Sequence, residues 1–265
     1  MMFEPTIWIG AILMGLSLGL LGSGGSILTV PLLVYIAHEP EKAAIAESLL
    51  IVGIVALTGS ITQFLKRLVD FRLVVVFGLP SMLAAYFGAY LSQYVGAQVQ
   101  MLIFASVMLL ASGFMLRPIS ALPNTNNTPN SINSRVDDFT LLQYLSLIIA
   151  GIGVGTLAGL IGVGGGFLIV PALLFIAKAT MRKAIATSLF IIAMQSFAGF
   201  MKYTYLQSTQ ELSLNVPLII LVTVCAVFGV LLGGMVVNKL PQARLKQVFG
   251  GALIPLSVFI PYNNV

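Results

Sequence analysis

The stretch "GLLGSGGSILTVP" (residues 19–31) returns 140 residues later as "GLIGVGGGFLIVP" (residues 159–171), with eight of the thirteen positions identical. The likeness continues from "PLLVYIAHEPEKAAIAESL" (31–49) to "PALLFIAKATMRKAIATSL" (171–189) at the same offset. Further on, "GAYLSQYVGAQVQMLIF" (88–104) aligns with "GGMVVNKLPQARLKQVF" (233–249) at an offset of 145. Chance likeness between apolar helices would match Leu and Val, but not Gly, Pro and Ser at fixed spacing. We therefore infer a duplication, with about five extra residues in the second half, most simply in 203–215.

The composition excludes most classes of protein. Of the 265 residues, 58% are hydrophobic and 8% are charged, whereas a soluble domain carries roughly 25% charged residues. A lipid bilayer is the solvent that suits such a chain. Its net charge of +5 comes from scattered Lys and Arg, which does not indicate nucleic-acid binding. One Cys and one His exclude internal disulfides and leave little for metal binding, so we expect no cofactor, no metal and no enzymatic activity.

Eight apolar runs are candidate membrane segments, because a spanning helix needs about 20 apolar residues. Residues 117–140 are rich in Asn, Ser and Pro and are predicted to form a flexible polar linker. The expected domains are an N-terminal repeat (1–116), this linker (117–140) and a C-terminal repeat (141–265). The runs are 6–37, 43–65, 71–95, 98–116, 141–177, 183–202, 213–238 and 243–261.

The two runs that carry the glycine clusters are too long for one crossing. As single helices, 6–37 and 141–177 would be about 48 and 55 Å long, against a hydrocarbon core of about 30 Å. Each is either one tilted, kinked helix or a re-entrant hairpin that breaks at the glycines and leaves on the side it entered. If every run crosses once, the Lys and Arg residues divide evenly between the two sides.

Re-entrant hairpins instead put eleven basic residues on one side and two on the other, which the bias of Lys and Arg toward cytoplasmic loops favours. The predicted fold class is therefore an all-α polytopic membrane protein made of two inverted repeats. Each repeat has one broken, re-entrant hairpin and three transmembrane helices, as in many transporters. The cytoplasmic side then holds the linker and Lys66, Arg67, Arg72, Arg117, Arg135, Lys178, Arg182, Lys183, Lys239, Arg244 and Lys246, and the other side holds Lys42 and Lys202.

The glycine clusters would form the hairpin tips and are candidate substrate-binding segments. Glycine allows positive φ and close approach of a ligand to the backbone, and the half-helix that follows offers unpaired N–H groups to an anion. Close helix packing is the alternative, and we prefer it for Gly15, Gly19, Gly155 and Gly159. The candidate binding residues are Gly22, Ser23, Gly24, Gly25 and Ser26 in the first cluster, and Gly162, Gly164, Gly165 and Gly166 in the second.

Five further positions are candidates in the segments that follow. Ser48 and Ser188 occupy matching positions, and with Thr187 they either coordinate substrate or simply cap and bond to their own helix. Glu47 stands where the second repeat has Thr187. An acid inside a membrane helix suggests a proton carrier, although an interfacial position next to "HEPEK" is the alternative. Gln195 lies deep in an apolar run and is a candidate to line a cavity.

The duplicated "GxGGx(4)VP" followed by "KAAIAESL" and "RKAIATSL" resembles the TauE/SafE family of membrane proteins over nearly the whole chain. The resemblance implies outward transport of sulfite, sulfoacetate or a related small anion. Position 47 departs from the family pattern, which more often has a small or hydroxyl residue there.

We expect a secondary transporter of the bacterial inner membrane that works by alternating access, with proton coupling left open. A passive anion channel or facilitator is the alternative. The expected partners are a small anionic substrate and the lipid bilayer but no nucleic acid, and a homodimer is left open.

Overall fold

The computed structural model describes residues 5–22, 24–116, 141–162, 166–207 and 214–236, and within these ranges it is all helix and turn, without a strand. Ser23, Gly164, Gly165, the linker 117–140 and the run 243–261 lie outside the described residues. Five described helices are long and apolar enough to cross a membrane, so the chain is an all-α membrane protein. These five are Glu41–Leu65, Phe71–Tyr94, Leu141–Ile161, Arg182–Tyr205 and Val216–Met235.

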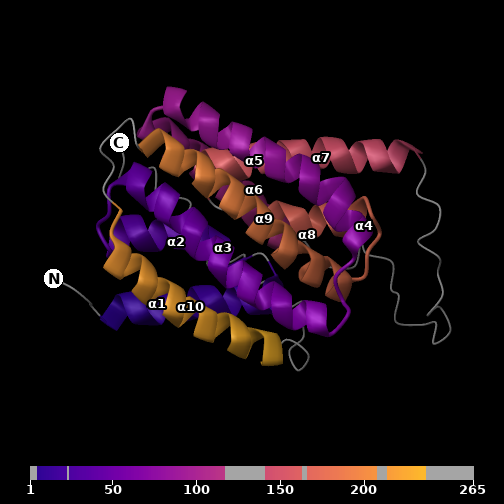
Figure 1. Cartoon of the computed structure of the whole chain (residues 1–265), viewed down its shortest axis with the longest axis horizontal. Coiled ribbons are helices and arrows are strands. Elements are labelled where there is room, and N and C mark those ends of the chain that lie inside the picture. The colour runs from indigo at the N-terminus through magenta and orange to yellow at the C-terminus, as the bar shows by residue number, and fades with distance from the viewer. Residues whose placement is uncertain (1–4, 23, 117–140, 163–165, 208–213, 237–265) are drawn as a thin grey trace.

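The helices follow one another in the order shown in Figure 1. The first repeat contains α1 (Pro5–Leu21), α2 (Ser26–Pro31) with the π-helical turn η1 (Leu32–Ile36), α3 (Glu41–Leu65), α4 (Phe71–Leu73), the π-helical turn η2 (Val74–Gly78), α5 (Leu79–Leu91), the 3₁₀ turn η3 (Ser92–Tyr94) and α6 (Ala97–Leu116). The second contains α7 (Leu141–Ile161), α8 (Gly166–Phe175), α9 (Met181–Gln207) and α10 (Val216–Val236).

Residues 6–37 form a helical hairpin rather than one long helix. After α1 ends at Leu21, α2 runs back along it: the Thr29 hydroxyl donates to the Met14 sulfur (2.9 Å), and Gly10 packs against Leu32. The segment α2–η1 is therefore antiparallel to α1. The second run breaks at the matching position, between Ile161 at the end of α7 and Gly166 at the start of α8. Entry of the hairpins into a membrane stays a prediction.

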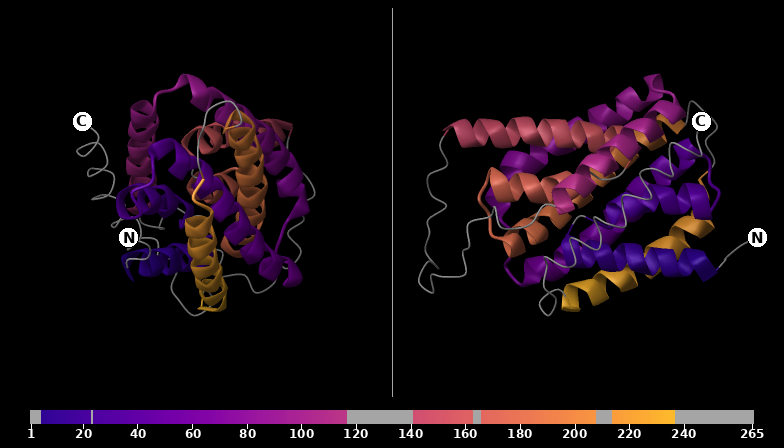
Figure 2. Two further views of the ribbon diagram at one scale, coloured as in Figure 1. Left: turned by 60° about the vertical axis from the view of Figure 1, so that its left-hand side comes forward. Right: turned by 180° about the vertical axis from the view of Figure 1, so that it is seen from behind.

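The first helix of each repeat, α1 or α7, packs on a late helix of the other repeat, α10 or α5. A Cβ at Gly15 in α1 would overlap the Ala226 carbonyl in α10, and one at Gly155 in α7 would overlap the Ser81 carbonyl in α5. The same holds for Gly19 with Val230 and for Gly159 with Ala85. Close packing is thus confirmed as the role of these four glycines. The two swapped pairs, α1 with α10 and α5 with α7, lie at opposite margins of the molecule (Figure 1 and Figure 2).

Helices α3 and α9, which are equivalent in the two repeats, cross the centre side by side and run antiparallel. Gly53 packs against Ser196 and Gly199 packs against Leu49, so residue numbers rise in one helix as they fall in the other. Crossed contacts of this kind are what an approximate two-fold relation between two similar units produces. The orientation of the repeats in a membrane is not part of this geometry and stays a prediction.

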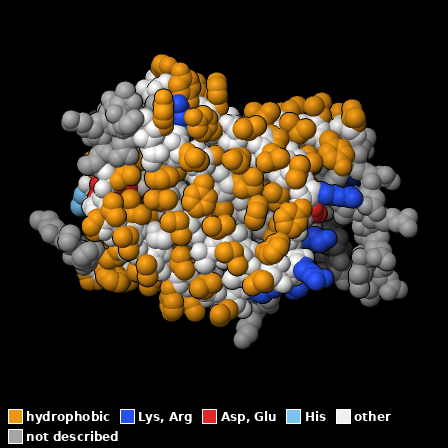
Figure 3. All heavy atoms as spheres, in the orientation of Figure 1, with side chains coloured by type: hydrophobic (Ala, Val, Ile, Leu, Met, Phe, Trp, Pro, Cys, Tyr) orange, Lys and Arg blue, Asp and Glu red, His pale blue; other side chains and the backbone are white. Residues whose placement is uncertain are grey.

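Among the described residues, charge is divided unequally between the two ends of the helix bundle. The end where α3 finishes and α9 starts carries Lys66, Arg67, Arg72, Lys178, Arg182 and Lys183, with Asp70 among them. The opposite end carries Glu39, Glu41, Lys42 and Lys202. Figure 3 shows basic side chains gathered at one end of a face that is otherwise mostly hydrophobic. This is the grouping that the re-entrant interpretation requires.

Candidate functional site

Each hairpin tip is held by the other repeat. Gly22 and Gly162 follow the ends of α1 and α7 and have φ of 71° and 77°, a conformation that glycine adopts at little cost. A Cβ on Gly22 would collide with Ile185 of α9, and a Cβ on Gly162 would collide with Ile45 of α3. The sequence predicted glycines with positive φ at the tips, but it did not predict these crossed contacts.

Two matching serines attach the tips to α3 and α9. The Ser188 hydroxyl lies 2.9 Å from the Gly22 carbonyl oxygen and 2.8 Å from that of Ile185. The Ser48 hydroxyl likewise donates toward the carbonyls of Gly162 and Ile45. A hydroxyl has one proton, and in both serines it is directed at backbone carbonyls. In this conformation the serines therefore act as cross-repeat ties, with their oxygen lone pairs left as acceptors.

The residue before each tie makes a second crossed contact. In α3, the Glu47 carboxylate accepts the backbone N–H of Asn215 at 2.7 Å. In α9, the Thr187 hydroxyl accepts the backbone N–H of Asp70 at 3.0 Å. Position 187 equals 47 plus 140, and position 215 equals 70 plus 145, so the two contacts are equivalent. We call them the Glu47 junction and the Thr187 junction.

Asn215 and Asp70 each begin a helix. The Asn215 side-chain oxygen accepts the N–H of Leu218 (3.3 Å) in α10, and the Asp70 carboxylate accepts that of Arg72 (3.1 Å) in α4, as expected of residues that cap a helix N-terminus. Asn215 thus connects the start of α10 to α3, and Asp70 connects the start of α4 to α9. The sequence analysis missed both.

Glu47 has more acceptor capacity than its contact uses. It is fully buried, and its second carboxylate oxygen, Oε2, has no hydrogen-bond partner among the described residues. The Asn215 side-chain amide donates to Glu39 at 2.7 Å, so one asparagine connects two acids. A buried carboxyl oxygen without a partner is unusual in a folded protein and commonly marks a functional group.

Gln195 is the other candidate with unused polar groups. Its side chain is fully buried, and neither its amide nitrogen nor its oxygen has a partner within the described part of the chain. Seven helical residues separate it from Ser188, so the two share one face of α9 about 10 Å apart. Ser196 and Thr223 also have buried hydroxyls without partners there. That Gln195 lines a cavity stays a prediction.

The remaining described candidates lie at the starts of the outgoing half-helices. Gly25 packs so tightly against the α1 backbone at Met14 and Leu18 that a side chain would not fit. Gly24 and Ser26 are buried beside it, and Gly166 is buried at the start of α8. The structure thus collects Gly22, Gly24, Gly25, Ser26 and Ser188 around one tip, and Gly162, Gly166 and Ser48 around the other.

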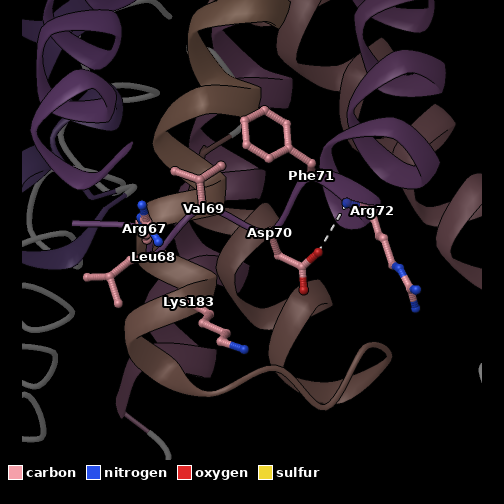
Figure 4. Close-up of a pocket in the computed structure, with 7 residues that line it drawn as sticks. All are labelled: Arg67, Leu68, Val69, Asp70, Phe71, Arg72 and Lys183. Atoms are coloured by element: carbon pink, nitrogen blue, oxygen red, sulfur yellow. Dashed lines mark hydrogen bonds between the residues drawn. The ribbon is translucent and has the colours of Figure 1, made fainter. Parts of the chain in front are cut away.

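A pocket that the sequence analysis did not anticipate opens beside the Thr187 junction. It has a volume of about 310 Å³ and is lined by Arg67, Leu68, Val69, Asp70, Phe71, Arg72 and Lys183. Figure 4 shows the Asp70 carboxyl group between the side chains of Lys183 and Arg72. The segment 66–72, with three basic residues in seven, was the available signal in the sequence, where it indicated only the side of the membrane.

Long apolar helices, an apolar outer face and buried polar groups between two crossed repeats define an integral, multi-pass membrane protein. Comparisons with known proteins narrow this class. The family described as "Sulfite exporter TauE/SafE" matches residues 7–260, and the chain belongs to that family.

Three curated relatives agree with this assignment. A probable membrane transporter protein of Xylella fastidiosa (strain Temecula1) is 29% identical over 255 residues, covering 95% of this chain and 92% of its own. The probable membrane transporter proteins YdhB and YunE of Bacillus subtilis are 24% and 30% identical, covering 89% and 68% of this chain and 91% and 70% of their own. No solved structure matches the chain. The resemblance to the TauE/SafE family is thereby confirmed, and with it a role in membrane transport.

Proposed function

We propose that this protein exports a small sulfur-containing oxyanion, such as sulfite or sulfoacetate, across the bacterial inner membrane. Family membership over residues 7–260 carries this proposal, since the family is described as sulfite exporters. The described residues contain no group of three or more His, Cys, Asp or Glu that could hold a metal ion. We propose transport without an enzymatic step, with the substrate anion and lipid as partners, the linker 117–140 on the cytoplasmic side and a homodimer left open.

Crossed contacts between the repeats support a mechanism of alternating access. Backbone-to-backbone glycine packing joins α1 firmly to α10 and α7 to α5, so each pair is expected to move as one rigid body. The ties Ser188–Gly22 and Ser48–Gly162 connect these bodies to the central helices α9 and α3. Rocking of the bodies about α3 and α9 would release one tip while closing the other. The substrate would lie between the tips, where backbone N–H groups of the half-helices suit an anion.

Glu47 is the proposed coupling residue. A carboxyl group can take up and release a proton, which the Thr187 hydroxyl at the equivalent position cannot do at physiological pH. Its second oxygen, Oε2, has no partner among the described residues and is free to take the proton. Its first oxygen contacts Asn215, the residue that caps α10, so protonation of Glu47 would affect a helix of the opposite repeat. In the proposed mechanism, Glu47 releases its proton to one side of the membrane and takes it up from the other, which couples anion export to proton entry.

Flux in proteoliposomes tests the proposal. We would measure sulfite and sulfoacetate flux with and without an imposed pH gradient, using Gly24→Val as the disabled variant. Saturable flux driven uphill by the gradient is the expected result. Saturable flux that runs only downhill would replace the coupled transporter by a facilitator or channel, and no flux of either anion would overturn the proposed substrate class.

A further inference from the structure

The basic residues of the pocket beside the Thr187 junction are not repeated in the sequence of the other half. By the repeat offsets Arg72 and Lys183 correspond to Pro217 and Ala43, and Arg67 falls opposite the segment 203–215, which contains no Lys or Arg. Duplication of the fold therefore does not explain the pocket, because the second copy of the same place carries no positive charge. These three cations therefore belong to one of the two junctions and not to the duplicated scaffold.

The lining has the chemistry of an oxyanion site. Three cations and the Asp70 carboxylate give it a net charge of +2. That carboxylate is already engaged in accepting the Arg72 N–H. The side chains of Arg67 and Lys183 have no hydrogen bond or ion pair within the part of the chain that the structure describes. The volume of about 310 Å³ equals that of about ten water molecules, enough for an oxyanion and part of its hydration shell. Guanidinium groups bind such anions through paired N–H donors.

A short chain of contacts connects the pocket to the first hairpin tip. Asp70, in the pocket wall, donates its backbone N–H to Thr187. The next residue of α9, Ser188, holds the Gly22 carbonyl. Neighbouring residues of α9 thus contact the pocket wall and the tip. At the opposite end the equivalent junction joins Asn215 to two acids, Glu47 and Glu39, which offer an anion no positive charge.

We propose that the pocket of Arg67, Arg72 and Lys183 is the loading site for a divalent oxyanion, and that the end bearing it is the face from which substrate enters. This deepens the proposed function and rests on it for the identity of the anion. The basic end attracts and concentrates the anion before it reaches the Gly22 tip. The opposite junction, around Glu39 and Glu47, offers no such positive charge, so substrate is expected to bind there with a higher KM. The gradients of anion and proton set the direction of net flux, and the unequal charges of the two junctions set the affinity at each face.

Chemical protection tests occupancy of the pocket without requiring transport. The full-length protein in nanodiscs of neutral lipid is treated with phenylglyoxal, which modifies arginines, and modification is read residue by residue by mass spectrometry. Because sulfite also adds to the carbonyl groups of phenylglyoxal, the rate at Arg67 is divided by the rate at Arg182, an exposed arginine outside the pocket lining, in the same sample. We expect millimolar sulfite to lower this ratio several-fold. The same ratio with and without sulfite would overturn the proposal.

A second arm separates a free anion from a lipid headgroup, which offers the same phosphate-like chemistry. Nanodiscs containing anionic phospholipid are treated without added sulfite. Protection of Arg67 there, together with none by sulfite in neutral lipid, would identify a headgroup site and overturn the loading role. Protection by sulfite in both lipids supports it.

Flux measurements then connect the pocket to transport. Arg67 has φ of 55°, so Arg67→Gly removes the charge and also suits the backbone. We expect Arg67→Gly and Lys183→Gln each to raise the KM for sulfite about fivefold with little change in kcat, since single exposed charges contribute up to about 1 kcal/mol. Lys178→Gly is the matched control, because Lys178 has φ of 50° at the same end but lies outside the pocket.

The outcomes distinguish the two proposals. Protection of Arg67 without any sulfite flux would keep the pocket as an anion site and overturn sulfite export. Sulfite flux with an unchanged KM in Arg67→Gly and Lys183→Gln would keep the exporter and overturn the loading site.

Discussion

The Glu47 junction and the Thr187 junction occupy the same place in the two repeats and make the same backbone contact, yet their charges differ. In each, a side-chain oxygen of the central helix accepts the N–H of a cap residue from the other repeat. At one end the central helix supplies the acid and the cap is Asn215. At the other end the cap supplies the acid, Asp70, and basic side chains surround it. The comparison separates what the two repeats share, a polar oxygen at this position, from what differs between them, the charge, to which we assign the proposed coupling and loading roles.

The largest expected effect comes from the tips, where the two repeats are alike. Gly22→Ala and Gly162→Ala should both abolish transport, because a side chain at positive φ costs about 1–2 kcal/mol and the new Cβ would collide with Ile185 or Ile45. Flux in proteoliposomes and the yield of folded protein are the measurements. Gly153→Ala is the control, since a Cβ on Gly153 meets nothing within 4 Å. A tip variant with full flux would show that the crossed contact is dispensable.

The next effect should fall on one repeat alone. Glu47→Thr copies the Thr187 junction into the first repeat, so the Asn215 N–H keeps an acceptor and the fold is retained. We expect uphill, gradient-driven flux to disappear while downhill flux persists, because the exchangeable proton is gone.

Flux with and without a pH gradient measures this change, and Glu41→Gln is the matched control at the same end of the molecule. Gradient-driven flux that survives in Glu47→Thr would remove Glu47 from the coupling mechanism. Loss of downhill flux as well would show that the acid acts in substrate passage rather than in coupling.

A smaller and symmetric effect is expected at the ties. Ser48→Ala and Ser188→Ala each leave a buried carbonyl, of Gly162 or Gly22, without its side-chain donor, which costs about 1–3 kcal/mol. Thermal unfolding in detergent should show similar losses for the two variants. Ser106→Ala, which removes an exposed hydroxyl bonded within its own helix, should change little. A large difference between Ser48→Ala and Ser188→Ala would mean that the two tips are not equivalent.

Much of the scaffold could be predicted from the duplicated sequence, but the contacts between its copies could not. The offset of 140 identifies Ser48 with Ser188 and Glu47 with Thr187, and the spacing of Gly15 and Gly19 predicts close packing. An offset states which residues are equivalent, not which residues touch. Asp70 and Asn215, the partners of Thr187 and Glu47, belong to the opposite repeat, so only the three-dimensional structure identifies them.

The basic pocket was harder to predict for a related reason. Lys183 lies more than a hundred residues from Arg67 and Arg72 in sequence, and charge counting assigned all three only to one side of a membrane. Their convergence around Asp70 depends on α3 ending where α9 begins, which follows from the antiparallel crossing of those helices.

The smallest expected effect concerns the turns that precede the two junctions. His38 and Lys178 are equivalent in the repeats and both have positive φ, 55° and 50°. Each ends its half-helix with a backbone bond that spans six residues, from Glu39 to Leu33 and from Ala179 to Leu173, a motif in which glycine is preferred at the left-handed position. His38→Gly and Lys178→Gly should therefore each stabilise the protein by about 0.5–1 kcal/mol, the relief of left-handed strain less the flexibility that glycine adds to the unfolded chain. Thermal unfolding in detergent measures the gain, and destabilisation by either change would show that the side chain contributes more than its backbone strain costs. Equal gains in stability for His38→Gly and Lys178→Gly would show that the two turns are equivalent and that the repeats differ in the charges of their junctions.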